Sequence, residues 1–119
     1  MERKAGVASP TLAGYPDAVR EVAREDGVAL IDLNAMSVTL YRALGPNLDR
    51  AFHDTSHHNN FGSYELARCV VEGIRTAKLD LVKFLAADAL PFDPAKPDDV
   101  AAFSLLASPS HDNTKPEGN

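Results

Sequence analysis

The 119-residue sequence has no tryptophan and a single cysteine, Cys69. One cysteine excludes an internal disulfide, and Cys69 falls within a helical apolar pattern, so we expect a small buried side chain there. No run of about 18 apolar residues occurs, so no membrane-spanning helix is predicted. The first six residues precede no apolar stretch, and we therefore expect no secretory signal in this sequence.

Positive charge is also scarce. The chain has 12 Lys and Arg against 17 Asp and Glu, which gives a net charge of −5. Without a basic stripe to displace counterions from phosphates, nucleic acid is not an expected partner. The length predicts one domain, which we expect over residues 1–108. Residues 109–119 are rich in Gly, Pro and Asn and are predicted to be a disordered tail.

Hydrophobic periodicity predicts helices over residues 15–26, 34–44, 60–74 and 79–87. Residues 28–33 begin with four consecutive apolar side chains, which is typical of a strand buried on both faces of a parallel sheet. A helix followed by such a strand is half of an α/β unit. The predicted fold class is therefore α/β, mostly helical, with one parallel strand.

The helix over residues 60–74 carries an apolar stripe at helical spacing, which we expect to face the core. The stripe consists of Phe61, Tyr64, Ala67, Val70, Val71 and Ile74. Arg68, Glu72 and Arg75 lie off this stripe and are predicted to form a solvated face.

Three of the four histidines cluster beside an aspartate just before this helix, in the string His53-Asp54-Thr55-Ser56-His57-His58. In a turn, a three-residue spacing can bring the Asp54 carboxylate onto one ring nitrogen of His57, leaving the other to accept a proton from a nucleophile. Plain capping and solvation of a surface loop would also explain the cluster. A metal site is a third possibility, since His and carboxylate ligands suit Zn²⁺, but His53 and His57 would need a helix to share one face.

A longer string, Asp-Thr-Ser-His-His-Asn-Asn-Phe-Gly-Ser-Tyr-Glu-Leu-Ala-Arg at residues 54–68, resembles the C-terminal block of the SGNH (GDSL-type) hydrolases. It looks most like that of rhamnogalacturonan acetylesterases. The resemblance implies the C-terminal portion of a flavodoxin-like three-layer α/β/α fold and a Ser-Asp-His triad without metal or organic cofactor. It further implies hydrolysis of acetyl esters on pectic polysaccharide, in a family that is usually exported.

Carried over by residue, Asp54 is the orienting carboxylate of the triad and His57 is the general base. His58 stands where many relatives carry Phe, and it is the alternative base. The nucleophile of the family lies in a Gly-Asp-Ser block, and this sequence contains no such string. Its blocks of oxyanion donors are not visible here either.

We therefore expect the C-terminal half of an esterase. The edges of its strand would need a missing N-terminal half or another chain to pair with. The alternative is a non-catalytic remnant or binding module of the same fold, and a His/Asp metal-binding protein is less favoured.

Overall fold

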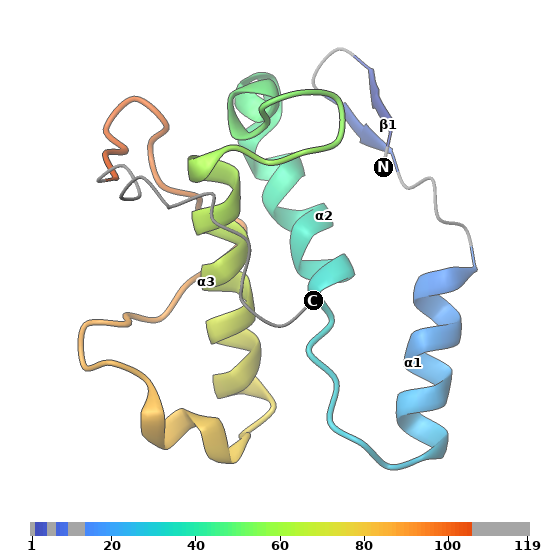
Figure 1. The fold of residues 1–119 in the computed structure, drawn as a ribbon. Coiled ribbons are helices and arrows are strands. Elements are labelled where there is room, and N and C mark those ends of the chain that lie inside the picture. Colours follow the sequence, from blue (N-terminus) through green and yellow to red (C-terminus); the bar gives the residue numbers. More distant parts are fainter. Residues whose placement is uncertain (1, 5–6, 10–13, 106–119) are drawn as a thin grey trace, which may run out of the picture.

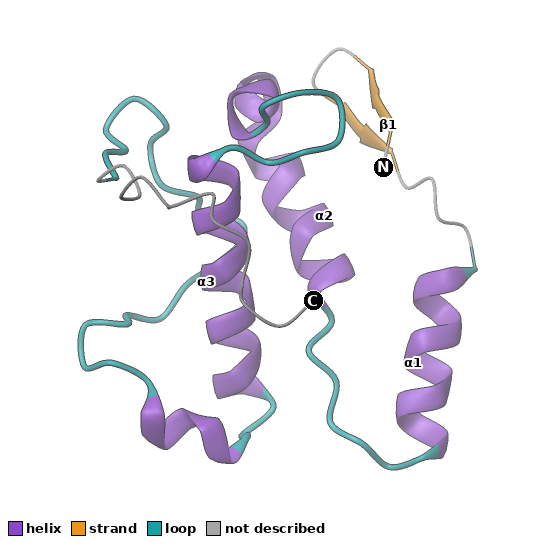
Figure 2. Cartoon of the chain, in the orientation of Figure 1, coloured by secondary structure: helices purple, strands orange, loops and turns teal. Residues whose placement is uncertain are grey.

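The structure is a computed structural model that describes residues 2–4, 7–9 and 14–105. Figure 1 shows the path of the chain and Figure 2 its secondary structure, in which helix predominates. The elements in order are β1 (Glu2–Lys4), β2 (Val7–Ser9), α1 (Tyr15–Glu25), α2 (Leu33–Leu44), the 3-10 helix η1 (Gly45–Ala51), α3 (Asn60–Thr76) and the 3-10 helix η2 (Asp80–Phe84). The predicted domain end and tail lie outside the described residues.

The core lies between α2, η1 and α3, where apolar side chains from all three elements meet. Leu40, Leu48 and Cys69 are fully buried there. The prediction of a buried cysteine is confirmed, and burial raises the pKa of its thiol to about 11. None of the helices described is both long and apolar enough to span a bilayer.

The boundaries of α1, α2 and α3 lie within about two residues of the predicted ones. At the start of α2, Asp32 is the N-cap: its Oδ1 accepts a hydrogen bond from the Ala35 backbone at 2.9 Å. At the start of α3, the Asn59 side chain caps the helix by accepting from the Gly62 N–H at 3.1 Å.

The predicted parallel strand at residues 28–33 is wrong for the described part of the chain. These residues run as an irregular connection from α1 into α2, and β1 and β2 pair antiparallel only with each other. A strand exists through hydrogen bonds to a neighbouring strand, and none of the described residues offers one to this segment. The described residues therefore form a mostly helical unit and not a complete three-layer sheet fold.

The predicted core face of α3 is also wrong in part. The buried residues of α3 are Phe61, Gly62, Glu65, Cys69 and Gly73. Tyr64, which was expected in the core, is 37% exposed. The helix is thus rotated relative to the prediction, with its small residues turned inward.

Polar side chains of α3 form what we call the polar stripe: Glu65, Arg68, Glu72 and Arg75. They hold residues 85–105, the return segment, against the helix. The Phe92 N–H donates to Glu72 Oε2 at 3.1 Å, and Arg75 donates to the Ala89 carbonyl. Arg68, Glu72 and Arg75 are therefore not the predicted solvated face. An irregular segment must satisfy its backbone polar groups outside a ladder, and these side chains do so.

The region before the return segment contains less helix than predicted. Only η2, a single short 3-10 helix, forms where residues 79–87 were expected to be helical. Three apolar side chains of η2 remain exposed: Leu81, Val82 and Phe84.

Candidate functional site

The histidine-rich segment, residues 52–59, is a loop between η1 and α3, and we call it the acid–base loop. A short antiparallel bridge joins Phe52 and His58 at its base. The His53 N–H donates to the His57 carbonyl at 2.7 Å, and the Asn59 N–H donates to the Ala51 carbonyl at 3.2 Å. These backbone bonds fix the loop ends at the start of α3.

Asn59 and Gly62 anchor the loop further. Besides capping α3, Asn59 donates through Nδ2 to the carbonyls of Arg50 at 2.7 Å and Phe52 at 3.3 Å. At Gly62, a Cβ atom would lie 2.0 Å from the Ala51 carbonyl oxygen, so only glycine lets η1 approach the helix so closely. The Asn59 side chain and the absence of a side chain at Gly62 therefore both help to anchor the loop.

The Asp54 carboxylate organises the middle of the loop. Its Oδ1 accepts hydrogen bonds from the backbone N–H groups of Ser56 and His57, each at 2.8 Å. Its Oδ2 lies 2.8 Å from Nδ1 of His57. The two backbone donors, followed by the His57 side chain, hold the pKa of Asp54 far below its usual range. Asp54 is thus a carboxylate at neutral pH.

His57 presents its second ring nitrogen to solvent. Its side chain is 78% exposed, and within the described residues Nε2 makes no hydrogen bond. With Nδ1 donating to Asp54, Nε2 is the basic nitrogen and can accept a proton. The Ser56 hydroxyl lies 3.4 Å from Nδ1, on the wrong nitrogen to act as a nucleophile activated by Nε2.

His58 has different surroundings. Its Nε2 lies 2.6 Å from the Tyr41 hydroxyl, and its ring packs against Phe52 with the centroids 4.3 Å apart. The half-buried His58 ring therefore ties the loop to α2. This geometry favours His57 over His58 as the base, although the catalytic role itself stays a prediction.

The described residues contain no group of three or more His, Cys, Asp or Glu arranged to hold a metal ion. His53 and His57 are joined through their backbones. Sequence reasoning missed Tyr41, because it lies 17 residues before its partner His58. The glycine in the first turn of α3 was a signal for the close approach of Ala51.

Comparison with known proteins gives one informative match. The chain is 34% identical to rhamnogalacturonan acetylesterase RhgT of Bacillus subtilis (strain 168) over 87 residues, which cover 60% of this chain. This similarity confirms the resemblance. The chain spans 38% of the length of that curated relative, which is an SGNH hydrolase. No family model matches the chain, and no solved structure matches it either.

Proposed function

We propose that this chain supplies the acid–base part of a carbohydrate O-acetyl esterase of the rhamnogalacturonan acetylesterase type. The reaction is hydrolysis of acetyl esters on pectic polysaccharide through a Ser-Asp-His triad, of which Asp54 and His57 are two members. The observation that carries the proposal is the 2.8 Å contact between Asp54 Oδ2 and His57 Nδ1. The similarity to a rhamnogalacturonan acetylesterase supports it.

In this mechanism His57 Nε2 takes the serine proton as the serine oxygen attacks the acetyl carbonyl carbon. Asp54 stabilises the resulting imidazolium. The ring then returns the proton to the sugar oxygen as the C–O bond to the acetyl group breaks, which leaves an acetyl-serine. Water attacks this ester with His57 again as base, and the ring returns the proton to the serine oxygen as the acetyl–serine bond breaks and acetate leaves. The serine belongs to a Gly-Asp-Ser block, which is absent from this sequence.

A hybrid enzyme tests the proposal directly. In it, the aligned residues of this chain replace their counterparts in the Bacillus subtilis relative, which provides the rest of the fold. We expect the hybrid to release acetate from acetylated rhamnogalacturonan. Asp54→Asn should lower kcat by about 10⁴-fold, because the imidazole would adopt the wrong tautomer. A folded hybrid without activity, or one indifferent to Asp54→Asn, would refute the proposal.

The alternative is a non-catalytic module of the same fold. It is favoured by one observation: within the described residues, no hydroxyl group contacts His57 Nε2. The chain alone should then hydrolyse no acetyl ester at high protein concentration, and a fluorophosphonate probe should label no serine. If the hybrid is also inactive, this alternative replaces the esterase proposal.

A further inference from the structure

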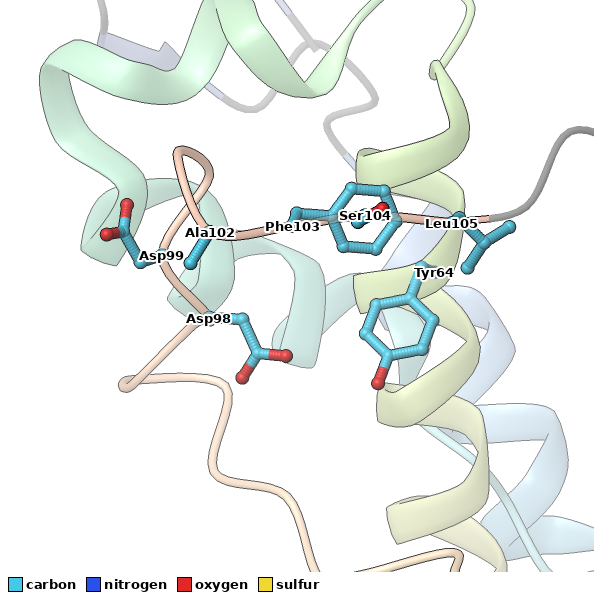
Figure 3. A pocket seen from close by; sticks show the side chains of 7 residues that line it. All are labelled: Tyr64, Asp98, Asp99, Ala102, Phe103, Ser104 and Leu105. Carbon is cyan, nitrogen blue, oxygen red and sulfur yellow. The ribbon is translucent and has the colours of Figure 1, made fainter.

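We propose that a groove on the outer face of α3 binds a neutral sugar residue of a polysaccharide. The inference rests on the proposed function, because it assigns part of the substrate to residues outside the acid–base loop. Figure 3 shows the first part of the groove, a hollow of about 410 Å³ lined by Tyr64, Asp98, Asp99 and Phe103 among others. A second hollow, of about 600 Å³, shares Tyr64 and Asp98 and continues along α3 past Arg68.

One wall of the groove is aromatic and anchored in the core. The Phe103 ring packs edge-on against buried Phe61, with the centroids 5.2 Å apart, and against Tyr64 at 5.3 Å. Tyr64 itself is 37% exposed, and in Figure 3 its hydroxyl end extends into the hollow on the side of Asp98. A fixed and partly exposed aromatic face suits the apolar C–H face of a pyranose ring, because little side-chain freedom is lost on binding.

A polar pair lies beside this aromatic wall and is equally fixed, with the Arg68 guanidinium 5.6 Å from the centroid of the Tyr64 ring. Asp98 accepts from Arg68 Nη1 at 2.6 Å, and its own N–H donates to Glu65 Oε2 at 3.4 Å. The Arg68 guanidinium lies over the Phe92 ring, 4.2 Å from the centroid. Carboxylate oxygens accept from sugar hydroxyls and guanidinium N–H groups donate to them. Both volumes lie in the range of small-ligand sites, roughly 300–1,000 Å³.

Charge selects among the possible sugars. Three carboxylates, Asp88, Asp98 and Asp99, line the two hollows, whereas the cation that the described residues place there, Arg68, is already paired with Asp98. A uronate or a phosphate would add a further negative charge beside them, and this repulsion disfavours it. A neutral, hydroxyl-rich ring meets no such penalty. The groove therefore fits a neutral sugar better than a uronate.

The groove lies close to the acid–base loop along the chain. Tyr64 is four residues beyond Asn60, the first residue of α3, which corresponds to about 6 Å of helical rise. A polymer can therefore engage both regions through the same end of α3. In this arrangement the groove holds one residue of the polysaccharide while another presents its ester.

Titration of the full chain with two tetrasaccharides tests the inference. The probes are a neutral galacto-tetraose and a tetra-galacturonate, followed through the NMR signals of α3 and the return segment. We expect the neutral sugar to bind at least about tenfold more tightly, with a Kd near the millimolar range. Equal binding of both sugars, tighter binding of the charged one, or no binding of either would overturn the inference.

Variants with a matched control locate the site. Tyr64→Ala should weaken binding of the neutral sugar at least about fivefold through the lost aromatic face. Tyr64→Phe keeps the ring and should stay within about twofold, which shows that folding is preserved. Tyr15→Ala removes another exposed tyrosine, on α1 and outside the groove, and should change nothing. A loss with Tyr15→Ala equal to that with Tyr64→Ala would place binding elsewhere and overturn the inference.

The binding readout separates this inference from the proposed function. If the hybrid enzyme fails to release acetate, binding of the neutral sugar still decides for or against the groove. If the hybrid is active but the tetrasaccharide does not bind, the groove is refuted and the esterase proposal stands.

Discussion

Two regions that both contact the α2–α3 unit are held in very different ways. The acid–base loop is fixed by backbone hydrogen bonds, by Asn59 and by the glycine contact with Ala51. In contrast, α1 stands apart from α3 in Figure 1 and reaches α2 through residues 26–32. Its side-chain link to α2 centres on Arg20, which contacts Asp32 at 2.6 Å and Asn34 at 3.4 Å.

The same contrast holds for apolar surface. Tyr15, Val19 and Val22 on α1 are more than half exposed, as is Val28 just after it. Near the acid–base loop, by comparison, Leu48, Ala51 and Phe61 are buried. The described contacts that support the Asp54–His57 pair thus lie close to α3, while α1 and Val28 expose apolar surface of the kind that other structure usually covers. We infer that rigidity is concentrated where proton transfer would need it.

The largest loss of stability should come from Gly62→Ala, and Gly73→Ala on the same helix is its matched control. Gly62→Ala would place Cβ 2.0 Å from a backbone oxygen of Ala51, whereas Gly73→Ala would place it 2.4 Å from the Ile31 side chain. Overpacking against the backbone should cost about 3 kcal/mol for Gly62→Ala. Gly73→Ala should cost about 1 kcal/mol or less, because Ile31 can shift and alanine favours the helix. Urea unfolding measures both, and equal losses would contradict the contrast between the regions.

Removal of the α3 cap should have the next largest effect. Asn59→Ala deletes one cap acceptor and two donors to carbonyls, which should lower the free energy of unfolding by about 2 kcal/mol. Asn59→Asp keeps the acceptor and should recover roughly half of that loss. Thermal unfolding of both variants checks this order. A stability of Asn59→Ala close to that of the parent chain would show that the loop is held by other contacts.

Hydrogen exchange should separate the two regions without any substitution. Amides of α1 should exchange through local opening, well before those of α2 and α3, since few buried contacts hold α1. Arg20→Ala removes the link to Asp32 and should accelerate exchange in α1 alone, leaving the midpoint of global unfolding unchanged. Exchange measured by NMR at single amides tests this. Equal protection of α1 and α3 in the parent chain would remove the contrast.

Acid should act on the loop through Asp54, with a smaller effect. Because its folded pKa is depressed, its contribution to stability is present above the unfolded pKa, about 3.9. That contribution is lost as pH falls below this value toward the folded pKa. The Ser56 and His57 amides should therefore lose protection below about pH 4. In Asp54→Asn their protection should be lower at neutral pH and depend less on acid, and an unchanged pH profile would contradict the assignment.

The sequence predicted what local patterns control. Hydrophobic periodicity placed α1, α2 and α3, and the three-residue spacing anticipated the turn that joins Asp54 to His57. Prediction from the sequence failed where contacts between distant segments determine the structure. The return segment covers the polar stripe of α3, and the hydroxyl of Tyr41 on another helix contacts His58. The apolar run at residues 28–33 indicates burial, but it does not show which strand would pair with it.

Substitution of two neighbouring histidines in the hybrid enzyme tests directly which ring is the base. His57→Ala removes the proposed base, whereas His58→Phe keeps an aromatic ring beside Phe52 and Tyr41. We expect acetate release to fall by at least about 10⁴-fold with His57→Ala and to stay within about threefold of the parent with His58→Phe. A severe loss with His58→Phe and a mild one with His57→Ala would show that His57 is not the base.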